Sequence, residues 1–133
     1  MTFPIEVDQV RAFEAAMNVR LPGMYVAGMR RANGGSVELD GEIWVLYPIR
    51  NGATHEVLRR TALDVAYHTR SNLERANFPR DGLAIAHDDA GGVLLLRIGA
   101  DRVVGKEVWY LGHGDAGPVQ VLDDVADLWK RRR

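Results

Sequence analysis

The residues best suited to chemistry are His87, Asp88 and Asp89, which are consecutive in the chain. An imidazole with two carboxylates can bind a divalent metal ion or transfer protons. The three fall at the end of a predicted strand and in a turn, and neighbouring strand residues point to opposite faces of a sheet. The three side chains are therefore poorly placed to converge on one metal ion. A turn held by aspartate side chains is the favoured interpretation, with an acidic partner-binding patch and a metal site as the alternatives.

The other histidines and the serines form no catalytic set. His113 stands between two glycines, which indicates a loop, and a solvated turn is favoured over a functional loop histidine. His55 and His68 are thirteen residues apart, whereas ligand pairs on one helix are three or four apart. Ser36 and Ser71 lack the glycines of a hydrolase nucleophile turn.

Cofactor chemistry finds no support in the composition. The chain has no cysteine, which excludes disulfides, a cysteine nucleophile, a thiolate zinc site and an iron–sulfur cluster. It also lacks a phosphate-binding glycine-rich loop. We therefore expect no cofactor and no bound metal.

Acidic residues gather in predicted loops and turns. If they converge, they form a surface that attracts a basic partner through its charge. The alternative is that turns favour aspartate in any protein. The candidate partner-binding residues are Glu38, Asp40, Glu42, Asp88, Asp89, His113 and Asp115.

The charge balance hides an asymmetry. The 133 residues carry a net charge of −1, but without the terminal run of Lys130 and Arg131 to Arg133 the charge is −5. We expect the run 130–133 to be a solvated tail, with contact to an acidic partner as the alternative. The acidic body argues against nucleic-acid binding, for which the basic tail and the arginines of residues 55–76 would be the alternative surface.

The elements that must position these residues follow from periodicity and turn signals. A helix capped by Asp8 ends before Leu21-Pro22, and a second helix runs from there to Asn33-Gly34-Gly35. Close strands joined by short glycine-rich turns favour antiparallel pairing. The remaining expected elements are strands at 41–49, 83–87, 93–98 and 106–111 and helices at 55–76 and 119–129.

These elements predict an α+β fold. A single domain over residues 1–133, with its core at about 7–129, holds an antiparallel or mixed sheet of about four to six strands packed against helices. Trp44 and Trp109 are expected in the core, and Trp129 beside the basic tail is less clearly placed. No leader segment and no stretch of roughly 20 apolar residues is present, so a cytoplasmic protein without a membrane partner is expected.

The order of motifs resembles the SUKH superfamily, which includes a fungal cell-wall-synthesis regulator and many bacterial immunity proteins. Leu21-Pro22, Tyr25 and Asn33-Gly34-Gly35 are similar to the opening motif of that family. Residues 82–96 are similar to its hairpin, and residues 105–114 to its last conserved strand. The sequence departs from the family pattern at Lys106, where proline is usual, and at residues 111–113, where Trp-Asp-His is usual.

The resemblance implies a SUKH-like fold and a non-catalytic protein-binding module. The expected function is that of an immunity protein that binds and neutralises a cognate bacterial toxin, such as a nuclease with a basic cleft. Two alternatives are a small metal-dependent or acid–base enzyme that uses His87, Asp88 and Asp89 with His113, and a regulatory interaction domain unrelated to toxins. The sequence leaves the oligomeric state open.

Overall fold

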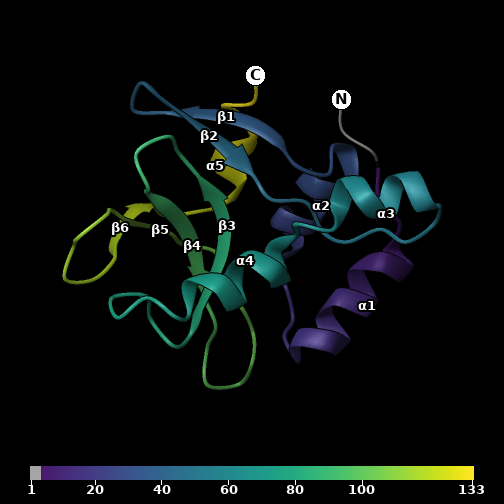
Figure 1. Cartoon of the computed structure of the whole chain (residues 1–133), viewed down its shortest axis with the longest axis horizontal. Helices are drawn as coiled ribbons and strands as arrows, with labels where there is room; N and C mark the ends of the chain where they lie inside the picture. Colours follow the sequence, from purple (N-terminus) through teal and green to yellow (C-terminus); the bar gives the residue numbers. More distant parts are fainter. Residues whose placement is uncertain (1–3) are drawn as a thin grey trace.

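Residues 4–133 are described by a computed structural model, in which helices and strands alternate in groups (Figure 1). Residues 1–3, which belong to the predicted domain 1–133 and to the segment in which no leader was expected, lie outside the described residues. The helices are α1 (Val7–Met17), α2 (Gly23–Arg31), α3 (His55–Thr61), α4 (Val65–Asn72) and α5 (Ala126–Trp129). The strands are β1 (Gly35–Leu39), β2 (Glu42–Leu46), β3 (Gly82–His87), β4 (Val93–Arg97), β5 (Val108–Leu111) and β6 (Val119–Leu122).

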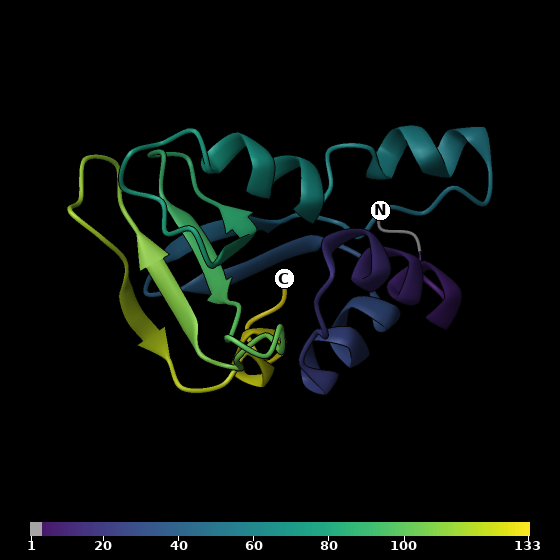
Figure 2. The same cartoon turned by 90° about the horizontal axis from the view of Figure 1, so that it is seen from below.

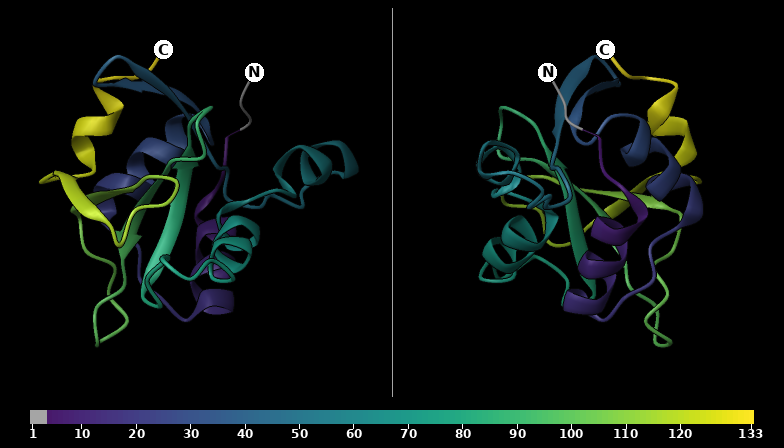
Figure 3. Two further views of the ribbon diagram at one scale, coloured as in Figure 1. Left: turned by 60° about the vertical axis from the view of Figure 1, so that its left-hand side comes forward. Right: turned by 90° about the vertical axis from the view of Figure 1, so that its right-hand side faces the viewer.

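The six strands form one sheet in the order of the sequence, and every pairing is antiparallel. This confirms the predicted α+β class and decides between an antiparallel and a mixed sheet. The sheet curls into a half-barrel (Figures 2 and 3). Curling turns one face of the sheet inward, so side chains on strands that are not neighbours approach each other across that face.

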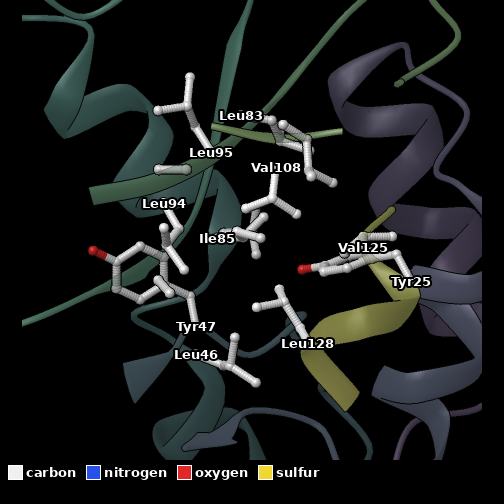
Figure 4. Close-up of a cluster of buried hydrophobic side chains, with 14 of the residues drawn as sticks. Tyr25, Leu46, Tyr47, Leu83, Ile85, Leu94, Leu95, Val108, Val125 and Leu128 are labelled. Atoms are coloured by element: carbon white, nitrogen blue, oxygen red, sulfur yellow. The ribbon is translucent and has the colours of Figure 1, made fainter. Parts of the chain in front are cut away.

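The core lies between the inward face of the sheet and the helices α2 and α5. Figure 4 shows Val125 and Leu128 of the C-terminal segment pointing toward Ile85 and Val108 of the sheet. All four side chains are completely buried. On the outer face α4 packs against β3, where the backbone amide of Ala84 donates a 2.9 Å hydrogen bond to the Thr69 hydroxyl.

The prediction of one continuous helix at 55–76 is wrong, because the structure has two helices, α3 and α4, in this range. Asp64 is buried and accepts a hydrogen bond from the amide of Tyr67, which starts a new helix. Thr61 ends α3 by bonding the backbone of Asn51 in both directions. These two caps satisfy backbone groups locally, and they turn one amphipathic pattern into two short helices.

Three other predicted elements differ from the structure. Residues 119–129 are β6 followed by the single turn of α5, and not one helix. β1 occupies residues expected to form a loop, because Asp40-Gly41, at φ values of 52° and 81°, makes a tight hairpin with β2. The first helix is capped by Glu6, in a reciprocal pair with Gln9, and not by Asp8.

The motif Asn33-Gly34-Gly35 does more than end α2. The Asn33 side chain is 4% exposed and pairs with the backbone of Ile49, donating to its carbonyl at 2.7 Å and accepting from its amide at 2.8 Å. The two glycines follow at φ values of 103° and 86°, a region that suits glycine. Asn33 therefore ties the helix end to the segment after β2.

The basic tail is docked, and the prediction of a solvated tail is wrong for Arg132. Its guanidinium donates to the carbonyls of Gly28, Ala32 and Gly34 at 2.7–3.0 Å and lies 4.7 Å from the centre of the Trp129 ring. The backbone of residues 131–133 also bonds β1, the edge strand of the sheet. Unpaired edge strands invite pairing with other chains, so the tail covers part of that edge.

Candidate functional site

A groove opens on the inward face of the sheet, bounded by the β1–β2 turn and by the β3–β4 turn. Its volume is about 330 Å³. We call it the acidic groove, and its lining residues are Leu39, Asp40, Glu42, Trp44, Asp88, Ala90, Tyr110 and Val121.

The floor of the acidic groove is aromatic. Trp44 of β2 and Tyr110 of β5 meet edge to face, with ring centres 5.8 Å apart and planes at 88°. Two strands separate β2 from β5 in the sheet order, so this contact depends on the curl and on side chains that reach across the inward face. Trp44 is 3% exposed, as expected for a core residue, whereas Tyr110 is half-buried. Edge-to-face pairs of this kind hold each other in a fixed geometry.

The charge of the acidic groove has one sign. Asp40, Glu42 and Asp88 line it, and none of the described lining residues is basic. Asp40 and Glu42 are exposed and Asp88 is half-buried, so the three negative charges can attract a cationic group on a partner. The structure thus brings together three of the seven residues predicted to bind a partner.

Asp88 is held in place by its own turn. Its Oδ1 atom accepts hydrogen bonds from the amides of Ala90 at 3.0 Å and Gly92 at 2.7 Å. This is the turn chemistry favoured for the 87–89 cluster. The same bonds fix the carboxylate at the edge of the acidic groove, so the turn and a charged surface are compatible roles for one residue.

The other four predicted residues lie outside the acidic groove. Glu38 points to the opposite face from Val37 and forms a 3.0 Å ion pair with Arg133. Asp115 is exposed, and its Oδ2 atom accepts from the amide of Gly112 at 2.8 Å. Asp89 and His113 are exposed turn residues that do not line the groove.

His87 and Asp88, which the enzyme alternative needs at one site, do not lie together in the structure. His87 packs on the other face, with its ring centre 5.3 Å from that of Tyr47, whereas Asp88 lines the acidic groove. Within residues 4–133, no group of three or more histidine, aspartate or glutamate side chains is placed to hold a metal ion. The structure therefore separates the residues on which the metal-site alternative depended.

One ring pair on the outer face was missed by sequence reasoning. His68 of α4 stacks on Tyr47, with centres 3.7 Å apart and planes at 9°, and its ring centre is 6.1 Å from that of His87. Burial lowers the pKa of His68, the charge of His87 lowers it further, and Asp64 opposes both effects. Burial also raises the pKa of the Tyr47 hydroxyl to about 12. This stack joins α4 to the sheet.

Tyr110 is the aromatic residue of the groove that the sequence analysis did not single out. The strand that contains Tyr110 was predicted. The side of the sheet to which the Tyr110 side chain points was not, because the strand 106–111 has no strict alternation of apolar and polar residues. The Asp40-Gly41 pair was an available signal for the hairpin, since it stands between alternating residues of β1 and β2. That signal would have placed Asp40 and Glu42 at one turn.

These features define a class: an α+β domain with a curled antiparallel sheet whose candidate site is a charged aromatic groove. The chain belongs to the SMI1 / KNR4 family (SUKH-1), whose family model matches residues 4–131. A comparison with curated proteins finds no match. In the part of the chain that the structure describes, no helix is both long and apolar enough to cross a bilayer.

Proposed function

We propose that the protein is a non-catalytic binding module that neutralises a cognate bacterial toxin by covering a basic surface of that toxin. Members of the family to which the chain belongs are commonly immunity proteins. The observation that carries the proposal is the acidic groove, where Asp40, Glu42 and Asp88 surround an aromatic floor without a basic neighbour in its lining.

A nuclease fits this groove best among toxins. Its active site must hold a phosphate backbone, so it presents arginine and lysine side chains. The three carboxylates occupy the place of phosphates, and Tyr110, supported from below by the buried Trp44, offers an apolar surface to the stems of those basic side chains. Opposite charges also accelerate association, which suits a protein that must capture a toxin before it acts.

The first experiment uses the protein encoded by the neighbouring gene. Expression of that neighbour is expected to arrest bacterial growth, co-expression of the present chain is expected to restore it, and the two proteins are expected to co-purify in equal amounts. A neighbour without toxicity, or growth that stays arrested on co-expression, would rule out the immunity function.

A second experiment tests the acidic groove itself. The triple variant Asp40→Asn, Glu42→Gln and Asp88→Asn removes charge and keeps every acceptor that the turns use, since asparagine tolerates the positive φ at residue 40. We expect it to fold normally and to lose at least tenfold in affinity for the toxin, mainly through slower association at low salt. A matched triple variant changes the same charge elsewhere: Asp8→Asn, Glu56→Gln and Glu74→Gln. Equal losses in both triples would contradict a role of this groove.

A further inference from the structure

A second groove lies between α1 and α4, on the helical side of the molecule. We call it the helical groove. In Figure 1, α1 lies at the lower right and α4 to its left near the lower centre, both away from the hairpin turns that bound the acidic groove. Its volume is about 610 Å³, which lies in the range of pockets that bind ligands. Phe13 and alanines of α1 and α4 form the apolar part of its lining.

The rim of the helical groove is basic. Arg50 and Arg70 both line it, both are exposed, and neither guanidinium group makes a hydrogen bond or an ion pair with any of residues 4–133. The acidic residue in the lining is Asp64, which is 5% exposed and caps α4 by accepting from the Tyr67 amide at 2.9 Å. Within the lining of the helical groove itself, the charge available to a ligand is therefore that of two guanidinium groups.

Tyr67 extends the helical groove along α4. Tyr67 is 45% exposed, so its ring is available to a ligand at the edge of the hollow. Tyr67 and Arg70 also line a shallower hollow of about 290 Å³ that continues to Ser71 and Glu74. The resulting surface is long and open, a shape that suits an extended chain better than a compact metabolite.

We propose that the helical groove binds a short acidic segment of a partner polypeptide. One apolar or aromatic side chain of that segment packs on Phe13 between α1 and α4, and its flanking carboxylates pair with Arg50 and Arg70. Arginine binds a carboxylate through two parallel hydrogen bonds, which gives direction as well as affinity. The site is opposite in charge to the acidic groove, and it does not depend on toxin neutralisation.

The test uses fluorescein-labelled peptides and fluorescence anisotropy. The probe is a nonapeptide in which aspartate and glutamate flank a central Phe-Leu pair, with two comparison peptides: one with lysine in place of each acidic residue, and one with serine in place of Phe-Leu. We expect the acidic apolar probe to bind at least tenfold more tightly than either comparison peptide. Equal binding of all three would overturn the proposal.

Two variants locate the binding. Arg50→Gln with Arg70→Gln is expected to weaken the probe at least tenfold, whereas the matched pair Arg80→Gln with Arg131→Gln, two exposed arginines outside the groove, is expected to change affinity less than twofold. Ala12→Phe fills the groove from the exposed side of α1 without a change of charge, and it is expected to abolish binding. Thermal unfolding checks that each variant folds. Unchanged affinity in either groove variant would overturn the proposal.

A small acid is the competing occupant. Phenylacetate offers the same pairing of a carboxylate and an aromatic ring without a chain. If phenylacetate displaces the probe at equal concentration, the site recognises a small molecule and the proposal of a peptide is overturned. Failure to displace at a hundredfold excess supports the peptide.

Discussion

The side chain of Asp88 closes over the backbone of Gly92 at the edge of the acidic groove. The Gly92 amide donates to Asp88 Oδ1 at 2.7 Å, and a Cβ atom on residue 92 would lie 2.8 Å from Oδ2. Contacts that short are not tolerated, so the absence of a side chain at Gly92 is what permits the carboxylate to lie there. The position of one of the three carboxylates of the acidic groove therefore depends on Gly92.

Gly92→Ala is expected to displace the Asp88 carboxylate and to lose the two hydrogen bonds that hold the turn. Each bond from an amide to a carboxylate contributes about 1–2 kcal/mol, so loss of both is expected to lower the free energy of unfolding by about 2–4 kcal/mol. Chemical denaturation measures this loss. Asp88→Asn is the control, because it keeps the acceptor and is expected to cost less than about 0.5 kcal/mol. Similar losses in the two variants would show that the negative charge, and not the space above Gly92, holds the turn.

Asn33→Ala is expected to destabilise the protein by about 2–4 kcal/mol, because it leaves the buried amide and carbonyl of Ile49 without partners. Asn33→Asp is expected to be at least as harmful, since a carboxylate oxygen would then face the carbonyl of Ile49. Denaturant titration monitored by circular dichroism tests both. If aspartate restored the stability of asparagine, the donor bond to Ile49 would not be the important one.

Tyr25→Phe is expected to cost little or to stabilise. The Tyr25 hydroxyl is buried beside Val125 and Leu128 (Figure 4) and makes no hydrogen bond within residues 4–133. Removal of a buried hydroxyl without a partner saves its desolvation penalty, so the change in unfolding free energy is expected to lie between zero and about +1.5 kcal/mol. Differential scanning calorimetry tests this. A loss above about 1 kcal/mol would mean that the hydroxyl has a partner in solution.

Arg132→Ala is expected to lower the free energy of unfolding by about 2–3 kcal/mol, since three carbonyl contacts and the packing on Trp129 are lost together. Arg132→Lys is expected to recover only part of this, because an ammonium cannot span the same carbonyls as a planar fork. Lys130→Ala is the matched control, as Lys130 makes one exposed ion pair with Asp127. Equal effects at residues 130 and 132 would contradict a docked tail.

The stability of the protein is expected to fall as the pH drops through about 6.5. The pKa of His68 is lowered in the folded protein, whereas it has its ordinary value of 6.5 in the unfolded chain. As the pH falls, the unfolded chain therefore takes up this proton first, and the free energy of unfolding decreases. The nearby groups that set this pKa are His87 of β3 and Asp64 at the start of α4. His68→Gln is expected to flatten the dependence of unfolding free energy on pH between 7.5 and about 5.5. An unchanged slope in that variant would assign the pH effect to other groups.

Much of the fold follows from short-range signals that the sequence carries. The helix stop at Asn33-Gly34-Gly35, the breaks around β3 and β4 and the antiparallel connections depend on residues that are neighbours in the chain. Glycine and proline act through the backbone conformation of their own position, so their effect needs no knowledge of distant contacts. These signals were enough to predict an α+β fold with antiparallel strands, which the structure confirms.

Errors arose where two elements share one local pattern. Residues 119–122 are apolar at alternate positions and also fit one turn of a helix, and a run of four residues cannot separate the two. Only pairing with β5 makes them a strand. The break between α3 and α4 likewise depends on Asp64 capping a helix and on Thr61 bonding Asn51, contacts that hydrophobic periodicity does not report.

The candidate site also depends partly on local sequence signals and partly on tertiary contacts. The sequence by itself determined that acidic residues occupy turns, because turns favour aspartate and the Asp40-Gly41 pair closes a hairpin. The tertiary structure alone decided which of them meet. Trp44 and Tyr110 lie 66 residues apart in the sequence, and only the curl of the sheet joins them into a floor beneath Asp40, Glu42 and Asp88. Register and curvature are properties of the whole sheet, so no local pattern contains them.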